Sequence, residues 1–194
     1  MISLIEKLKS SIRKNNLLYT ELRNLYGIKK GLSGLLKNRR GSLEHIKSTL
    51  SLIKKSDKII GKPINISIEP ASICNLKCPV CETGIGDLRR KKAYLTFENF
   101  KIIIDKVVSH TNTLMYYFMG EPFVNKEWVR QIKYAKSKGI PFIITCTNGD
   151  FANAEDIIES KIDWVSFQLG GITPETHRVY RIDSDFNRVI KNLK

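Results

Sequence analysis

Three cysteines with the spacing CxxxCxxC are the residues of this 194-residue sequence best suited to carry chemistry. Cys74, Cys78 and Cys81 form one short stretch, and the fourth cysteine, Cys146, lies far along the chain. A short loop with thiolates at these offsets can hold three irons of a cubane cluster and leave the fourth iron without a protein ligand. An iron left open in this way is a place where a substrate or cofactor can bind.

Two other interpretations of these cysteines stay open at this point. Structural zinc needs four nitrogen or sulfur ligands in a closed tetrahedron. No second CxxC pair and no His-x-x-x-His follows the loop, so a zinc site would need a distant ligand such as Cys146 or His110. Cysteines without any metal are the remaining alternative. The tight spacing favours metal chemistry in a reducing compartment, and a [4Fe-4S] cluster is the prediction that follows from it.

The elements that must position these cysteines alternate between strands and helices from residue 63 onward. Residues 64–70 alternate apolar and polar side chains at period two, as a strand does. Thr96, followed by Glu98 and Asn99, resembles a helix start. The predicted order is strand 64–70, helix 97–108, strand 113–119, helix 127–138, strand 141–146, helix 154–160, strand 163–169 and helical segments 174–181 and 185–194.

Four strand-then-helix units in a row imply parallel strands joined by right-handed crossovers. A closed barrel of this kind needs more than four units. We therefore predict an α/β fold, a partial TIM-like (β/α) barrel with parallel strands, in residues 63–194. The sequence reads as an incomplete barrel.

An α-helical N-terminal extension is predicted for residues 1–62. Leucine and isoleucine recur there at three- and four-residue spacing, and Lys37-Asn38-Arg39-Arg40 marks an exposed basic turn. The extension holds 15 of the 33 Lys and Arg and four of the 19 Asp and Glu, so most of the net charge of +14 belongs to it. It either packs on the domain with a solvated basic face or contacts an anionic surface such as lipid, nucleic acid or an acidic partner.

Two further motifs follow the strands at which the barrel would build a site. Phe118-Met119-Gly120-Glu121-Pro122 ends the second strand, and Thr145-Cys146-Thr147-Asn148-Gly149 closes the third. With the cysteine loop, they resemble the signatures of the radical S-adenosylmethionine superfamily, and the chain looks like the core of its SPASM-type enzymes in truncated form. Met119 stands where the family often has the first glycine of a Gly-Gly-Glu-Pro motif, a change that we expect to be tolerated.

The resemblance implies a chemistry and a set of cofactors. In that family the open iron is chelated by the amino and carboxylate groups of S-adenosyl-L-methionine. One electron from the reduced [4Fe-4S] cluster breaks the carbon–sulfur bond and yields methionine and a 5′-deoxyadenosyl radical, which abstracts hydrogen from a substrate. The implied electron donor is a protein such as flavodoxin or ferredoxin, and the implied substrate is a peptide or a small molecule.

Site residues follow from matching positions. The resemblance implies cluster ligands at Cys74, Cys78 and Cys81. Gly120 and Glu121 would meet the methionine amino group, Gln168 has donors and acceptors for a carboxylate or ribose, and Arg181 would help to hold the cofactor carboxylate. The predicted cofactor-binding residues are Gly120, Glu121, Thr147, Asn148, Gln168 and Arg181. Taken without the resemblance, these are strand-end turns and a surface arginine, and no catalytic side chain is predicted.

Three functions from different classes are therefore weighed. The first is a radical enzyme, or its cofactor-binding half, in the cytoplasm. The second is an electron-transfer or cluster-carrying protein without radical chemistry. The third is a basic binding protein with a structural metal, against which stands the scarcity of aromatic residues in 1–62, where Tyr19 and Tyr26 are the only ones. No stretch is apolar for long enough to span a membrane.

Overall fold

The computed structural model describes residues 20–22, 24–26, 28–29 and 39–194. The chain divides into two compact units, Met1–Ile64 and Asn65–Lys194, which are treated separately below. The functional assignment of 1–62 as an extension and 63–194 as a core domain stays a prediction.

The first unit contributes helix α3, Arg39–Ile53, to the described residues. It covers the predicted apolar positions Leu43 to Ile53. Because α3 begins at Arg39, the prediction of a basic turn over 37–40 is wrong for Arg39 and Arg40. The apolar positions predicted before residue 19 lie outside the described residues, and no helix in the described ranges is long and apolar enough to cross a membrane.

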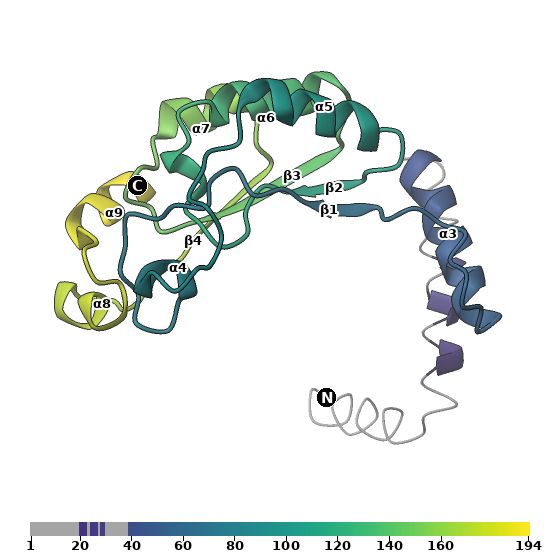
Figure 1. The fold of residues 1–194 in the computed structure, drawn as a ribbon, viewed down its shortest axis with the longest axis horizontal. Helices are drawn as coiled ribbons and strands as arrows, with labels where there is room; N and C mark the ends of the chain where they lie inside the picture. The colour runs from purple at the N-terminus through teal and green to yellow at the C-terminus, as the bar shows by residue number, and fades with distance from the viewer. Residues whose placement is uncertain (1–19, 23, 27, 30–38) are drawn as a thin grey trace. The chain divides into compact units, whose positions relative to one another are not determined.

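A four-stranded parallel sheet forms the framework of the second unit (Figure 1). Its strands are β1 (Asn65–Ser67), β2 (Thr113–Met115), β3 (Phe142–Thr147) and β4 (Trp164–Phe167), and they lie side by side in chain order. The register pairs Ile66 with Leu114, and Leu114 with Ile143. Parallel strands in sequential order confirm the predicted α/β arrangement.

The helices that follow the first three strands cover one face of the sheet. These are α5 (Phe97–Val107), α6 (Trp128–Ser137) and α7 (Ala154–Ser160), which line up along one side in Figure 1. A doubly wound fold would place helices on both faces, whereas a (β/α) barrel winds in one direction. The open sheet with a single helix layer is thus part of a barrel, as predicted.

The core lies between that helix layer and the sheet. Phe100, Ile104 and Ile132 meet Leu114, Tyr116 and Ile143, and all six side chains are fully buried. The Tyr116 hydroxyl donates to the Gln131 side chain, whose Nε2 donates to the Leu95 carbonyl at 2.7 Å. Because the Tyr116 hydroxyl and the Gln131 side chain have hydrogen-bond partners inside the core, their burial does not destabilise the fold.

The predicted helix starts and ends are close to the observed ones. Thr96 caps α5, with its hydroxyl accepting from the Asn99 N–H at 3.3 Å. The last helices are α8 (Pro174–Tyr180) and α9 (Phe186–Leu193). Two short elements were not predicted: the one-turn helix α4 (Glu82–Ile85) and the 3₁₀ helix η1 (Pro122–Val124). Helices this short leave no periodicity in a sequence.

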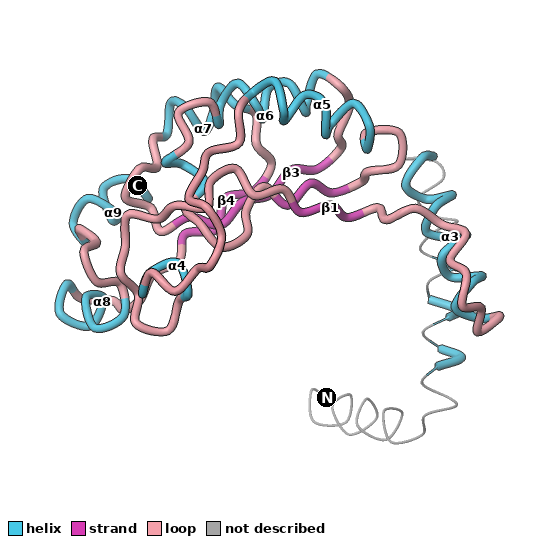
Figure 2. Tube along the Cα trace, viewed as in Figure 1, coloured by secondary structure: helices cyan, strands magenta, loops and turns pink. Residues whose placement is uncertain are grey.

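The first two strands are shorter than predicted, since regular pairing ends at Ser67 and Met115. One more ladder bond forms in each case, Ile68 N–H to Met115 O at 2.9 Å and Tyr116 N–H to Ile144 O at 2.8 Å. Beyond these bonds the strands β1 and β2 separate into loops, which lie at the same end of the sheet (Figure 2). Of these two segments, residues 117–119 line a cavity at this end of the sheet.

Candidate cofactor site

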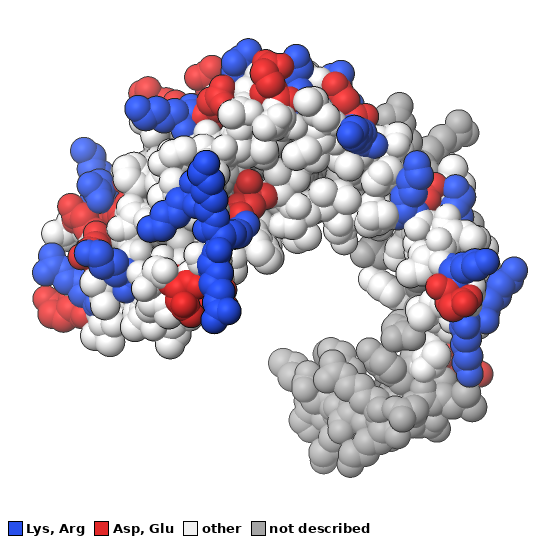
Figure 3. Space-filling model, viewed as in Figure 1, with Lys and Arg blue, Asp and Glu red and all other residues white. Residues whose placement is uncertain are grey.

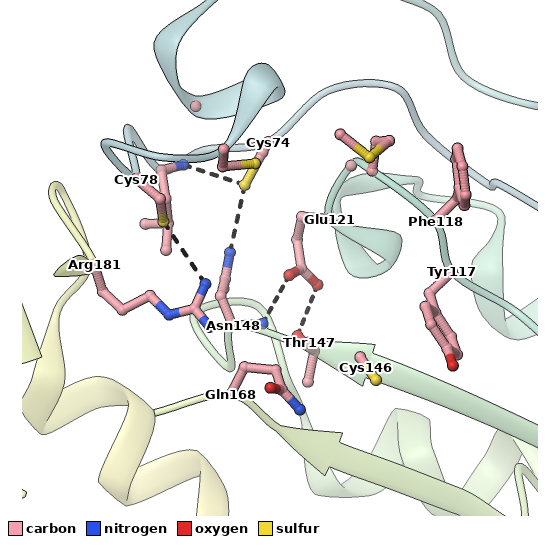
Figure 4. Close-up of a pocket in the computed structure, with 15 residues that line it drawn as sticks. Cys74, Cys78, Tyr117, Phe118, Glu121, Cys146, Thr147, Asn148, Gln168 and Arg181 are labelled. Atoms are coloured by element: carbon pink, nitrogen blue, oxygen red, sulfur yellow. Dashed lines mark hydrogen bonds between the residues drawn. The ribbon is translucent and has the colours of Figure 1, made fainter. Parts of the chain in front are cut away.

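One cavity lies at the carboxyl ends of the four strands (Figure 4), and all nine predicted site residues line it. They are Cys74, Cys78, Cys81, Gly120, Glu121, Thr147, Asn148, Gln168 and Arg181. Their neighbours in the lining are Leu76, Gly84, Tyr117, Phe118, Met119 and Cys146. Segments that lie far apart in the sequence, such as those of Cys74 and Arg181, thus meet in one place. Parallel (β/α) folds gather their active sites at this end of the strands.

The cysteine loop joins β1 to α4 and presents its thiols on the cavity side. Cys78 is buried, whereas Cys74 and Cys81 are half-buried, and all are free thiols. Cys81 is the N-cap of α4, and its N–H donates to the Cys78 carbonyl at 3.2 Å. Burial is the main cause that raises the pKa of the Cys74 thiol, and the carboxylate of Glu121 and the other two cysteines add to the effect.

The segment after α8 holds the cysteine loop from outside. The Lys77 N–H donates to the Ile182 carbonyl at 3.1 Å, and the Lys77 ammonium pairs with Asp183 at 2.8 Å. Leu76 is 2% exposed and anchors the middle of the loop. These contacts and the buried leucine fix the conformation of the cysteine loop, which reduces the entropy cost of binding a ligand there.

The Gly-Glu-Pro segment after β2 packs directly against the start of the cysteine loop. A Cβ added to Gly120 would lie 2.0 Å from the Ala71 carbonyl oxygen, so no other residue fits without moving the backbone. The Glu121 N–H donates to the Ile73 carbonyl at 2.9 Å. The missing side chain of Gly120 thus lets two loops of the protein approach each other closely.

Met119 is fixed through its backbone. Its N–H donates to the Glu69 carboxylate at 3.0 Å, and its carbonyl accepts from the Thr83 hydroxyl at 3.1 Å. Neither bond uses the Met119 side chain. This explains in physical terms how methionine can stand at a position where a glycine was expected.

Glu121 connects the ends of β2 and β3. Its carboxylate accepts from the Thr147 hydroxyl at 2.7 Å, the Asn148 N–H at 2.8 Å and the Phe123 N–H at 3.2 Å. Burial raises the pKa of Glu121, and the hydrogen bonds from Asn148, Thr147 and Phe123 act in the opposite direction. A carboxylate has about four acceptor sites, so three internal bonds leave room for roughly one further donor from the cavity.

Asn148 links β3 to the cysteine loop. Its side-chain amide donates to the Asn75 oxygen at 2.8 Å and points toward the Cys74 sulfur at 3.8 Å, while its own oxygen accepts from the Asp150 N–H at 3.0 Å. The turn that follows depends on Gly149, whose φ of +88° disfavours any other residue. The predicted Asn-Gly turn is present, and it orients Asn148 toward the cysteines.

Gln168 and Arg181 approach the cavity from β4 and α8. The Gln168 amide donates to the Ser166 hydroxyl at 2.7 Å. Arg181 directs its Nη1 toward the Cys78 sulfur at 3.7 Å, and its buried Nε has no hydrogen-bond partner among the described residues. An unsatisfied buried guanidinium N–H is costly. It marks this wall of the cavity as suited to an anionic group.

Cys146 lines the same cavity from β3, beside the other residues and not in the core. It is half-buried, and burial is the first cause that raises the pKa of its thiol. His110, which was considered as a distant zinc ligand, is buried and does not line the cavity.

A buried network behind the cavity was missed by sequence reasoning. The Asp150 side chain is fully buried and accepts from Asn75 at 2.8 Å and from the Ser184 hydroxyl at 3.3 Å, and it pairs with Arg188 at 3.1 Å. His177 Nε2 lies 3.0 Å from the same Ser184 hydroxyl. The network connects the cysteine loop to α8 and α9, and its only sequence signal was a turn composition at Asn-Gly-Asp.

His177 is a structural residue in this network. Its Nδ1 accepts from the Gly170 N–H at 3.3 Å, which leaves Nε2 to donate to Ser184. The side chain is fully buried, and burial followed by the charge of Arg181 lowers its pKa. The neutral ring therefore connects the end of β4 to the cysteine loop through Ser184 and Asp150.

The three cysteines do not converge on a single point. Within the described ranges, no group of three or more His, Cys, Asp or Glu side chains is gathered closely enough to hold one metal ion. Zinc needs its ligands around one centre. A cubane instead takes each thiolate at a different iron, so the separated thiols of one loop suit a cluster better than a single ion.

Comparison with known proteins identifies the family of this chain. The model of the radical SAM superfamily matches residues 68–194, which is most of the chain, so the chain belongs to the radical SAM superfamily. The superfamily consists of enzymes that use a [4Fe-4S] cluster and S-adenosylmethionine. The predicted family is therefore confirmed.

Individual relatives cover only part of their own length. The chain is 28% identical to Fe-coproporphyrin III synthase of Methanosarcina barkeri over 62% of this chain and 30% of that protein. It is 30% identical to an uncharacterised protein of Methanocaldococcus jannaschii over 66% of this chain and 42% of that protein. The chain thus spans less than half the length of these curated relatives.

A solved structure supports the fold. Streptococcus suis SuiB bound to S-adenosylmethionine superposes with a TM-score of 0.59 and 15% identity, covering 90% of this chain and 43% of SuiB. At this identity the likeness concerns the fold, and it agrees with a partial TIM-like barrel.

Proposed function

We propose that this chain is the cofactor-binding core of a radical S-adenosylmethionine enzyme. Cys74, Cys78 and Cys81 hold a [4Fe-4S] cluster, and S-adenosylmethionine binds at the iron without a cysteine ligand. The observation that carries the proposal is the single cavity in which the three cysteines meet Glu121, Asn148 and Arg181. A sequence match alone would leave open whether these segments come together.

The residues present fit both groups. Three thiols from one anchored loop are suitable donors for three irons. The partnerless Nε of Arg181 lies on the wall near Cys78, where an anionic cluster or a carboxylate would satisfy it. The remaining acceptor capacity of Glu121 suits an ammonium donor. The donor set and the polar wall are therefore complementary to a cluster and an amino acid.

When bound, the two cofactors would supply the radical chemistry, which is the one-electron reductive cleavage of the sulfonium carbon–sulfur bond and the abstraction of hydrogen from a substrate. This chain's residues position the partners of that step. Arg181 places positive charge beside the cysteines, and Glu121 presents a buried acceptor. Leu76 and Cys78 are both buried and anchor the inner side of the loop.

The substrate, the surface contacted by residues 1–62 and the cellular compartment are part of the same proposal. The proposed substrate is a peptide or a small molecule, and residues 1–62 are candidates for contact with an anionic surface. Cysteines without disulfide bonds among the described residues favour a reducing compartment such as the cytoplasm.

The test is reductive cleavage. After anaerobic reconstitution with iron and sulfide, reduction in the presence of S-adenosylmethionine should release 5′-deoxyadenosine and methionine in equal amounts, measured by chromatography. Air-oxidised protein is the control. A reconstituted and reducible cluster that yields no 5′-deoxyadenosine would support the alternative of an electron-transfer or cluster-carrying protein.

A further inference from the structure

Four consecutive cations follow α4 and were not singled out by the sequence motifs. Arg89, Arg90, Lys91 and Lys92, called the basic run below, are all exposed. Arg90 forms an ion pair with Glu69, and the other three form none among the described residues. In Figure 3, Lys and Arg side chains gather near the position of α4. Residues 82–92 contain only two acids, Glu82 and Asp87, so the surface has a net positive charge.

The basic run is tied to the cysteine loop by backbone contacts. The Ser72 hydroxyl donates to the Lys91 carbonyl at 3.2 Å, and the Ser72 N–H donates to the Ala93 carbonyl at 3.0 Å. Paired segments of this kind lie about 5 Å apart, and the two residues from Ser72 to Cys74 span at most about 7 Å. The backbone of Ala93 is thus within roughly 12 Å of Cys74.

The outer side of the cysteine loop reaches the surface close by. Val80, between the second and third cysteines, is 78% exposed, and Ile85 on α4 is 56% exposed. Apolar side chains with charged residues beside them are typical of a protein interface. Interfaces for electron transfer are small and transient, so they need only a small patch.

We propose that the basic run and the exposed residues Val80 and Ile85 dock an acidic protein that donates one electron at a time. The inference rests on the proposed function, because it needs a cluster at the three cysteines. The step moves one electron: the donor is oxidised, the cluster is reduced, and no bond is made or broken. Positive charge beside the cluster attracts an acidic donor and orients it toward Cys74, Cys78 and Cys81.

The experiment measures how fast flavodoxin hydroquinone reduces the reconstituted cluster, by stopped-flow absorption, at several salt concentrations. The variant replaces three cations at once, Arg89→Glu, Lys91→Glu and Lys92→Glu. The matched control reverses three other exposed cations that form no ion pair among the described residues, Lys106→Glu, Lys161→Glu and Lys191→Glu. Arg90 is left in place because it pairs with Glu69.

At low ionic strength the variant should be reduced at least about tenfold more slowly than the wild type, and the control should differ little from it. The difference should shrink as salt approaches about 1 M, where the Debye length falls to about 3 Å. The wild-type rate itself should fall with salt. Equal rates for variant and wild type, or a wild-type rate that ignores salt, would overturn the docking surface.

A small uncharged reductant distinguishes a failure of the docking surface from a failure of the proposed function. Photoreduced 5-deazariboflavin needs no docking site, so it should reduce wild type and variant alike and give 5′-deoxyadenosine with both. If it gives none with the wild type, the proposed function fails and the docking surface with it. If it works while flavodoxin reduces both proteins equally fast, only the docking surface is wrong. Should the reversed charges impair cluster content, the glutamine variants of the same three residues give the same comparison.

Discussion

Cys74→Ala, Cys78→Ala and Cys81→Ala are each expected to abolish the iron–sulfur cluster, while Cys146→Ala leaves it intact. Two remaining thiolates hold a cubane poorly, and the cavity offers no other thiol on the cysteine loop. Iron should fall from about four per chain to well below about one in each loop variant. Iron and acid-labile sulfide, together with visible absorption after anaerobic reconstitution, measure the loss.

Cys146 is a demanding control because it lines the same cavity. It comes from β3 and not from the loop, and its neighbours on that strand, Thr145 and Thr147, are buried. If Cys146→Ala lost iron as fully as the loop variants, the cluster would have four cysteine ligands and no open iron. The electron-transfer alternative would then be favoured.

Glu121→Gln is expected to lower the free energy of unfolding by about 1–3 kcal/mol. The three donors that meet the carboxylate cannot all be satisfied by an amide, because its NH₂ is itself a donor facing Thr147 or Asn148. One of these buried groups loses its partner. Urea denaturation of the metal-free protein measures the change, with Glu82→Gln, an exposed carboxylate on α4, as the matched control.

The same variant tests the cofactor side of Glu121. With the cluster loaded, S-adenosylmethionine should bind more weakly by about 1.5–3 kcal/mol, which is on the order of tenfold or more in affinity. A stability equal to that of the wild type would contradict the hydrogen bonds described for Glu121. Unchanged affinity for S-adenosylmethionine would remove Glu121 from the cofactor site and leave it a structural residue.

Local motifs made much of the site predictable. The cysteine loop, the Gly-Glu-Pro segment and the Asn-Gly turn each occupy a few consecutive residues, and each follows a strand. Parallel strands bring such segments to one edge, so their convergence followed once the alternation of strands and helices was recognised. The helices α6 and α7 were predictable for a similar reason. The apolar periodicity of α6 and the polar N-cap residue Asn153 of α7 are strong local signals.

The supporting contacts could not be predicted, because they join distant residues. Glu69 meets Met119, Thr83 meets the same residue from the opposite side, and Asp150 meets Asn75. None of these pairs has a spacing that a sequence pattern would reveal. The early ends of β1 and β2 have the same origin, since residues 68–70 and 117–119 bond to the loops of the site instead of continuing the ladder.

Binding of S-adenosylmethionine to the open iron is the most direct test of the central claim. The reduced cluster of the wild type should give an electron paramagnetic resonance spectrum that changes on addition of S-adenosylmethionine. Cofactor labelled with ¹⁷O in its carboxylate should add a hyperfine coupling to that spectrum. A reduced cluster whose spectrum is the same with and without the labelled cofactor would contradict the account, because every iron would then be closed to it.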